Sequence, residues 1–152
     1  MNVYLAASFK NQFLMKMIRE YLKDQVPGIN ITSRWIDQGS EILPLRQRAK
    51  LDYEDVDNSN VLVCFFPLSE TGGAISEMAY CLGKGKKVLY CVKPEFFPGV
   101  DNPGSDPLPV GLLKHYPSYG SLSIKDNGYI IHTVGDLCDT LRWYLTQYTK
   151  LK

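Results

Sequence analysis

Residues 52–90 read DYEDVDNSNVLVCFFPLSETGGAISEMAYCLGKGKKVLY, and this stretch decides the fold. Its centre, Asn60-Val-Leu-Val-Cys-Phe-Phe66, is an uninterrupted apolar run, which is typical of a parallel strand covered by helices on both faces. A glycine turn, Gly72-Gly73, then leads into the helical pattern of Ala74 to Leu82. In open α/β sheets, ligands bind beyond the carboxyl ends of the strands, beside helix starts. The stretch therefore predicts a central strand with a ligand site beyond its end.

The alternation of strands and helices continues on both sides of this stretch. Strands are expected at Val3 to Ala7, Asn30 to Trp35, Asn60 to Phe66, Lys87 to Val92 and Tyr129 to His132. Helices are expected at Asn11 to Asp24, Ile42 to Asn58, Ala74 to Leu82 and Gly135 to Tyr148. Such alternation predicts a parallel sheet with right-handed crossovers. We expect an α/β fold: one three-layer, doubly wound domain over residues 1–152, flavodoxin-like (Rossmann-like), with a five-stranded parallel sheet and helices on both faces.

Asp52 stands out because it shares a helical stripe with apolar residues. It follows Ala49 by three positions and precedes Val56 by four, and Leu45 completes the stripe, so a carboxylate occupies a core-facing slot. A buried charge is costly without a partner. Arg48, four residues earlier, is within reach on the helix surface for a structural ion pair. From its position alone, Asp52 is open equally to a structural and a functional interpretation.

Glu77 is expected in the first turn of its helix, where the helix dipole stabilises a carboxylate. Ala74, three residues earlier, has no side-chain acceptor, so Glu77 does not complete a capping box. The same dipole is expected to keep the pKa of Glu77 low and its carboxylate ionised. An ionised carboxylate can act as a nucleophile.

Three blocks of the sequence resemble the nucleoside 2-deoxyribosyltransferase superfamily, which includes the 2'-deoxynucleoside 5'-monophosphate N-glycosidases. Val3-Tyr-Leu-Ala-Ala-Ser-Phe9 is similar to the family's opening strand and small-residue turn. Asp52 stands eight positions ahead of Asn60, and the family carries an Asp at the same distance before the Asp or Asn that starts its apolar strand. The most specific block, residues 71–89, looks like the family's glycine turn, nucleophilic Glu and glycine-lysine entry into the next strand. The sequence departs from the family pattern at Asn60, often Asp, and at Ala79, often Gly.

The resemblance implies roles for two acidic residues: Glu77 is the nucleophile and Asp52 is its acid or orienting partner. Asp55, one helical turn after Asp52, is our reserve candidate for the acid. Ser8, Thr71 and Gly73 match family positions that line the sugar or 5'-phosphate pocket. The full set of expected substrate-binding residues is Ala7, Ser8, Lys10, Arg48, Thr71, Gly72 and Gly73.

The implied reaction is cleavage of the N-glycosidic bond of a 2'-deoxynucleoside through a deoxyribosyl-Glu77 intermediate, with transfer to an acceptor base. The first alternative is hydrolysis of a (deoxy)nucleoside 5'-monophosphate, for which Ser8, Lys10, Thr71 and the glycine amides offer donors near the 5' position. The second alternative is a non-catalytic nucleotide-binding or sensor module. An NAD-binding fold is disfavoured because the first strand leads into Ala6-Ala-Ser-Phe-Lys10 rather than a G-x-G-x-x-G turn.

Composition limits the other function classes. The chain has 152 residues, 45% of them apolar, and a formal net charge of +1, so a nucleic-acid polymer is not the expected partner. No stretch has the length of a membrane span and no signal-peptide pattern is present, so we expect a cytoplasmic protein without a membrane partner. The cysteines stand singly and no Cys or His cluster predicts a metal or other cofactor. The expected partners are a small-molecule nucleoside or nucleotide, an acceptor base, and further copies of the chain in a homodimer or larger assembly.

Residues 93–128 form a long region rich in proline and glycine. Phe96, Phe97, Tyr116 and Tyr119 lie within it, and these aromatic residues favour an ordered loop. Long loops in a compact domain are usually functional or disordered. Two roles are equally open: the aromatic residues cover a sheet edge, or they close over a base or complete a neighbouring subunit's site.

Overall fold

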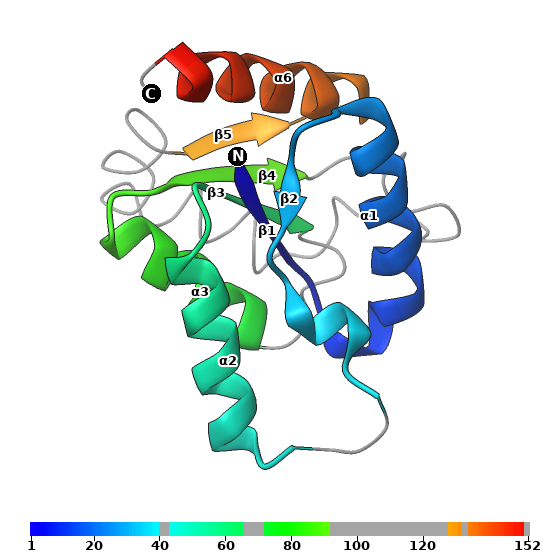
Figure 1. The fold of residues 1–152 in the computed structure, drawn as a ribbon. Coiled ribbons are helices and arrows are strands. Elements are labelled where there is room, and N and C mark those ends of the chain that lie inside the picture. Colours follow the sequence, from blue (N-terminus) through cyan, green and yellow to red (C-terminus); the bar gives the residue numbers. More distant parts are fainter. Residues whose placement is uncertain (40–42, 66–71, 92–127, 132–133, 151–152) are drawn as a thin grey trace.

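One parallel sheet forms the centre of the fold in the computed structural model, which describes residues 1–39, 43–65, 72–91, 128–131 and 134–150 (Figure 1). Its strands are β1 (Asn2–Ala6), β2 (Asn30–Ile31), β3 (Val61–Phe65), β4 (Lys87–Cys91) and β5 (Gly128–Ile131). They lie in the order β2-β1-β3-β4-β5, and every neighbouring pair is parallel. This is the strand order of flavodoxin-like sheets, whose ligands bind where the chain switches direction between β1 and β3.

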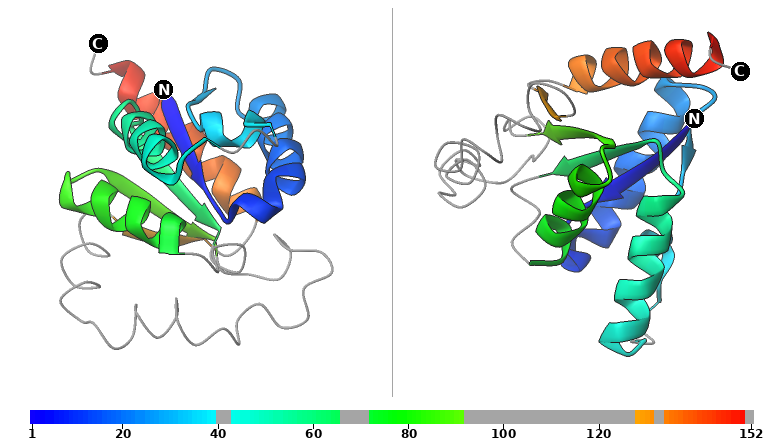
Figure 2. Two further views of the ribbon diagram at one scale, coloured as in Figure 1. Left: turned by 90° about the horizontal axis from the view of Figure 1, so that it is seen from below. Right: turned by 90° about the vertical axis from the view of Figure 1, so that its left-hand side faces the viewer.

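Helices cover both faces of the sheet. One face carries α1 (Gln12–Gln25) and α6 (Val134–Lys150), and the other carries α2 (Leu45–Asp57) and α3 (Gly72–Gly83) (Figure 2). The guanidinium group of Arg142 joins the first two by donating to the carbonyl oxygen of Gln25 at 2.7 and 3.1 Å. Two short 3-10 helices, η1 (Phe9–Asn11) and η2 (Arg34–Asp37), follow β1 and β2. The α/β class that the sequence predicts, with a parallel sheet and helices, is confirmed.

The core is centred on β3. All of its residues are buried, and it lies between β1 and β4 as a central strand. Tyr4, Leu5, Leu62 and Leu89 from the three strands have no exposed surface. Burying a side chain of this kind stabilises the fold by about 1.5–3 kcal/mol. The uninterrupted apolar run in the sequence therefore marks the strand that contributes most to the core.

The second strand is much shorter than predicted. The sequence favours a strand to Trp35, but β2 ends at Ile31 and the chain turns into η2. Side chains replace the missing strand ladder: the backbone N–H of Leu5 donates to Ser33 Oγ at 2.6 Å, and Trp35 Nε1 donates to the carbonyl oxygen of Leu5 at 2.9 Å. Because these bonds satisfy the backbone of β1, the chain can leave the sheet without orphaned polar groups.

Two features end helices on the sheet's amino side. Gly28 after α1 and Gly85 after α3 have φ angles of 98° and 70°, in the left-handed region that favours glycine. Lys86 closes the end of α2, because its Nζ donates to the carbonyl oxygens of Val56, Asp57 and Ser59 at 2.8, 2.6 and 2.9 Å. A cation is favourable there because the last carbonyl groups of a helix have no internal partners.

The remaining predictions on the fold divide into those the structure describes and those it does not. Cys64, Cys81, Cys91 and Cys138 are buried, and none of the four is in a disulfide. Among the described residues, no helix is both long and apolar enough to cross a membrane. The predicted loop at 93–128 lies outside the described residues up to its last position, where Gly128 begins β5.

Candidate active site

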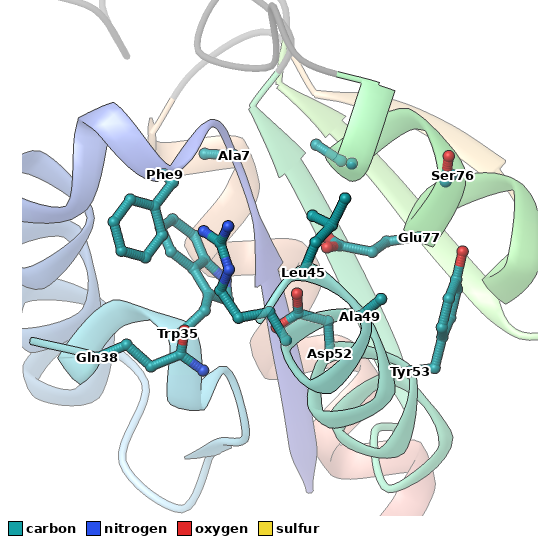
Figure 3. Close-up of a pocket in the computed structure, with 13 residues that line it drawn as sticks. Ala7, Phe9, Trp35, Gln38, Leu45, Ala49, Asp52, Tyr53, Ser76 and Glu77 are labelled. Carbon is teal, nitrogen blue, oxygen red and sulfur yellow. The ribbon is translucent and has the colours of Figure 1, made fainter. Parts of the chain in front are cut away.

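A pocket of about 470 Å³ opens beyond the carboxyl end of β1 (Figure 3). This volume lies within the range of small-molecule sites. Its walls come from the turn after β1, from η1 and η2, from the first part of α2 and from the start of α3. The lining residues are Ala7, Phe9, Trp35, Gln38, Leu45, Arg48, Ala49, Asp52, Tyr53, Gly73, Ala74, Ser76 and Glu77. The pocket therefore lies at the edge of the sheet where the strand order predicts a ligand.

Asp52 faces this pocket from α2. The predicted stripe of Leu45, Ala49, Asp52 and Val56 is present, but only Val56 at its end is fully buried in the core. Leu45 is 76% exposed at the pocket rim, and Ala49 and Asp52 line the wall between. The stripe thus runs from the core into the pocket, which explains a carboxylate on an otherwise apolar face.

Glu77 faces the pocket from α3. The helix begins at Gly72, not at Ala74, so Glu77 is in its second turn and no acidic residue lies in the first. The prediction of a first-turn carboxylate is wrong because the glycine pair belongs to the helix rather than to the preceding turn. Figure 3 shows the carboxyl groups of Asp52 and Glu77 pointing into the same part of the pocket.

Both carboxyl groups have a raised pKa. Burial, with a contribution from the charge of Asp52, raises the pKa of Glu77 from 4.5 to about 8. Burial, with a contribution from the charge of Asp55, raises the pKa of Asp52 from 3.8 to about 6. The predicted low pKa of Glu77 is therefore wrong, because loss of hydration outweighs a helix dipole that acts mainly within the first turn. Burial therefore favours the protonated form of Glu77 more strongly than that of Asp52.

Tyr4 lies beneath this pair and was not a candidate from the sequence. Its side chain is fully buried on β1, and burial and the charge of Glu77 raise the pKa of its hydroxyl, which therefore keeps its proton. The hydroxyl lowers the pKa of Glu77, although its geometry makes no hydrogen bond to any described residue. The protonated hydroxyl of Tyr4 thus lies beside the Glu77 carboxyl group.

Three buried polar atoms on the pocket wall have no hydrogen-bond partner within the described part of the chain: Gln38 Nε2, Arg48 Nε and Asp52 Oδ1. The expected ion pair between Arg48 and Asp52 is absent there, although the charge of Arg48 does lower the pKa of Asp52. Unsatisfied buried polar atoms are rare in native proteins and call for an explanation. These three atoms are therefore hydrogen-bonding groups that the pocket offers to a polar ligand.

Aromatic side chains lie beside these polar groups. The ring centroids of Phe9 and Trp35 are 6.5 Å apart, and the guanidinium carbon of Arg48 lies 5.6 Å from the centroid of Phe9. Tyr53 lines the pocket from α2. Sequence reasoning missed these residues and Gln38. The signal was available for Trp35 and Gln38, because they follow the second strand at the same carboxyl edge of the sheet.

Asp55 is placed elsewhere. It is 3% exposed, and its two carboxylate oxygens accept hydrogen bonds from Arg34, at 2.6 Å from Nε and at 2.9 Å from the backbone N–H. It is not among the pocket-lining residues. Because both oxygens are engaged in this pair, the structure assigns Asp55 a structural role and gives no support to its use as a reserve acid.

The other predicted binding residues are only partly brought together. Ala7 and Gly73 line the pocket, and Gly72 begins α3. Ser8 is buried between two lining residues but does not itself line the pocket, and Lys10 is exposed on η1. Thr71 lies outside the described residues. Across those residues no group of His, Cys, Asp and Glu side chains has an arrangement that would hold a metal ion.

The fold and the pocket define an α/β protein with a two-carboxylate site at the carboxyl edge of a parallel sheet. Its fold resembles that of the Clostridium botulinum CMP N-glycosidase BcmB, with a TM-score of 0.56 and 16% identity over 98% of each chain. A conserved protein from Enterococcus faecalis V583 has a TM-score of 0.63 and 17% identity over 95% of this chain and 98% of that one. BlsM has a TM-score of 0.60 and 13% identity over 98% of this chain and 93% of the BlsM chain.

No family model and no curated protein matches the sequence. At identities below a fifth, the likeness to solved structures shows a shared fold over nearly the whole chain. This agrees, at the level of the fold, with the resemblance to the nucleoside 2-deoxyribosyltransferase superfamily.

Proposed function

We propose that this protein cleaves the N-glycosidic bond of a nucleoside or nucleotide, with Asp52 and Glu77 as its catalytic pair. The observation that carries this proposal is two carboxyl groups with raised and different pKa values in one aromatic-walled pocket. Such pairs are typical of acid–base and nucleophilic sites. The shared fold with a CMP N-glycosidase supports the same class of reaction. Membership of the superfamily that the sequence resembles is part of this proposal.

The aromatic side of the pocket suits a nucleobase. Phe9 and Trp35 offer ring faces for stacking, which is worth about 1–3 kcal/mol per base. The unsatisfied donors Gln38 Nε2 and Arg48 Nε can give hydrogen bonds to carbonyl oxygens or ring nitrogens of a bound base. A base held on this side directs its sugar toward the carboxyl groups.

In the proposed reaction, the bond between the anomeric carbon and the base nitrogen breaks as the carboxylate of Glu77 bonds to the anomeric carbon. Asp52 gives its proton to the departing base. A second base or a water molecule then attacks the anomeric carbon, the Glu77 ester bond breaks, and the proton of the attacking group passes to Asp52. The protein ends in its starting protonation state.

The proton must begin on Asp52 for this order of steps, whereas the higher pKa belongs to Glu77. Between the two pKa values the pair carries one proton in total, and the two sites titrate together. We propose that bound substrate shifts this proton to Asp52, because a base nitrogen placed beside Asp52 accepts a hydrogen bond from its protonated carboxyl group and so favours that form. Tyr4 beside Glu77 favours the same ionised form.

Transfer of a deoxyribosyl group to an acceptor base is the first form of the proposal. Hydrolysis of a nucleoside 5'-monophosphate is the second, and the fold shared with a CMP N-glycosidase favours it specifically. Both forms use one covalent intermediate. A non-catalytic binding protein would keep the pocket without turnover.

The test is chromatographic detection of free base from a panel of nucleosides, deoxynucleosides and their 5'-monophosphates, each with and without a second base. Glu77→Gln is expected to abolish release, and Asp52→Asn to slow it by about 10²–10⁴-fold. Glu54→Gln, on α2 outside the pocket lining, is the matched control and should retain activity. Exchange that needs the second base supports transfer, and release from monophosphates alone supports hydrolysis. Tight binding without release by the unaltered protein would refute the proposal.

Mass spectrometry of acid-quenched protein locates the intermediate. A sugar adduct on the peptide that contains Glu77 is expected. An adduct on the peptide that contains Asp52 would reverse the two roles, and no adduct during rapid turnover would refute covalent catalysis.

A further inference from the structure

Gln12, the first residue of α1, joins that helix to the end of η2. Its Nε2 donates to the carbonyl oxygen of Trp35 at 2.6 Å and to that of Gln38 at 2.9 Å. A primary amide has two N–H donors, so these two bonds use both. Gln12 is half-buried and is not among the pocket-lining residues. Its effect on the pocket must therefore pass through the two residues that it holds.

Trp35 and Gln38, which Gln12 holds, both line the pocket (Figure 3). The indole N–H of Trp35 is bonded to the carbonyl oxygen of Leu5 at 2.9 Å, which leaves the ring to face a ligand. The side-chain nitrogen of Gln38 is buried and has no hydrogen-bond partner within the described part of the chain. Gln12 thus fixes the backbone of one residue that can stack on a flat group and of one that can donate to it.

The end of η2 needs an outside donor because its own hydrogen bonds stop there. The backbone N–H of Gln38 reaches the carbonyl oxygen of Trp35 at 3.3 Å, and Gln38 itself is extended, with φ −63° and ψ 122°. The last carbonyl groups of a helix have no partners within the helix. Gln12 supplies to the carbonyl oxygen of Gln38 the bond that a further turn of η2 would have given.

We propose that Gln12 is a positioning residue for base recognition, because its two bonds set the direction in which the Gln38 amide enters the pocket. This inference rests on the proposed function, in which the pocket binds a nucleobase. A side-chain amide distinguishes bases only where its N–H meets an acceptor, and a hydrogen bond weakens steeply as its angle falls. Without Gln12 the pocket still holds a base against Trp35 but distinguishes less between one base and another.

Arg19 provides a matched control, because it also joins α1 to η2. It lies two helical turns after Gln12 and forms an ion pair with Asp37. The hydrogen bonds of its guanidinium group go to the carboxylates of Glu20 and Asp37. Arg19→Met therefore loosens η2 from α1 without removing the donor from the carbonyl oxygens of Trp35 and Gln38.

The first test is titration calorimetry of deoxynucleosides and their 5'-monophosphates carrying adenine, guanine, cytosine or thymine. Glu77→Gln is the background, so that the ligands are not consumed. In this background Gln12→Met should weaken binding of the preferred base about tenfold, as expected for the loss of about one hydrogen bond. Binding of the least preferred base should change much less, so the ratio of their dissociation constants falls. Arg19→Met should leave this ratio unchanged, and circular dichroism should show every variant folded.

Gln12→Glu separates the hydrogen bonds of Gln12 from its shape. Glutamate has nearly the size of glutamine, but its carboxylate has no donor and faces two carbonyl oxygens. Gln12→Glu should reduce the ratio between bases at least as much as Gln12→Met. A Gln12→Glu variant that binds every base as the background does would overturn the proposal.

A double-mutant cycle tests whether Gln12 acts through Gln38. Gln38→Met alone should reduce the ratio, and adding Gln12→Met should reduce it no further, because residues that act as a unit are not additive. An equal effect of Gln12→Met with and without the Gln38 amide would overturn the proposal. So would an effect of Arg19→Met as large as that of Gln12→Met, which would indicate general loosening of η2, or equal binding of all four bases by the background.

Turnover gives a separate measurement. In the otherwise unaltered protein, Gln12→Met should raise KM for the preferred substrate about tenfold and change kcat by less than about threefold, because Asp52 and Glu77 lie on other helices. A fall in kcat with KM unchanged would overturn the proposal. A protein that binds bases selectively but releases none would refute the proposed reaction, while the binding ratios would still decide the role of Gln12.

Discussion

Replacing Glu77 by glutamine is expected to stabilise the folded protein, and to do so more strongly as the pH rises. In the folded protein the pKa of Glu77 is raised from 4.5 to about 8, chiefly by burial. A carboxyl group with a raised pKa binds its proton more tightly in the folded state than in the unfolded state. Its contribution to stability is therefore complete below pH 4.5 and is lost as the pH rises toward 8. Glutamine keeps the shape of the protonated side chain without this loss.

The size of the effect follows from the two pKa values. One pH unit between them corresponds to about 1.4 kcal/mol, so the whole difference sets a ceiling of about 5 kcal/mol. Glu77 lines an open pocket that admits water, and we expect roughly half of the ceiling, about 2–3 kcal/mol. For a domain of this size, 1 kcal/mol shifts the melting temperature by about 2–4 °C. Glu77→Gln should thus melt about 5–10 °C higher than wild type at pH 8.5 and at nearly the same temperature at pH 4.

The assay is thermal unfolding of wild type and Glu77→Gln, followed by circular dichroism at intervals between pH 4 and pH 9. Glu54→Gln serves as the control because the Glu54 side chain is 45% exposed and outside the pocket lining. The difference in melting temperature between Glu54→Gln and wild type should not grow above pH 6. If the melting temperatures of Glu77→Gln and wild type differed equally at every pH, or if the variant were less stable at pH 8.5, burial would not hold the proton on Glu77.

Three other side chains give predictions of their own. Asp55→Ala should lower the free energy of unfolding in urea by about 2–3 kcal/mol, because it leaves Arg34 without its buried partner, and an unchanged midpoint would contradict this. Lys86→Met should lower the free energy of unfolding by about 1–2 kcal/mol in the same experiment, because three carbonyl oxygens at the end of α2 lose their donor. If Lys86→Ala were as stable as wild type, these contacts would contribute nothing to stability. Tyr4→Phe should leave stability nearly unchanged, because the hydroxyl has no partner among the described residues. It should move the basic limb of the pH–rate profile to higher pH, because the hydroxyl lowers the pKa of Glu77. An identical profile would show that Tyr4 takes no part in the reaction.

The central part of the fold was predictable because its signals are local. The apolar run at residues 60–66 has the period and length of a buried strand, and β3 occupies Val61–Phe65. Asp52 interrupts an apolar stripe at helical spacing, and it lines the pocket from α2. Both inferences needed only the periodicity of one element and its distance along the chain from the next.

What the sequence could not provide depends on contacts between distant segments. The residues from Thr32 to Trp35 favour a strand by composition, but Ser33 and Trp35 bond to the backbone of Leu5 instead. The ionisation of Glu77 depends on how deeply α3 is packed beside Tyr4 and Asp52, which helix position alone does not reveal. Asp55 and Asp52 differ by three positions on one helix, and only the place of Arg34 in space separates the structural residue from the candidate catalytic one.

The bond from Trp35 to β1 limits what the aromatic wall can do. An indole ring has a single donor, and that of Trp35 is already committed to the carbonyl oxygen of Leu5 at 2.9 Å. Trp35 therefore meets a ligand with its ring alone, and a flat ring accepts any base of suitable size. Discrimination between one base and another must then come from the polar side chains around the ring. We therefore expect substitutions of Gln38 or Arg48, with Trp35 kept, to change which base is preferred.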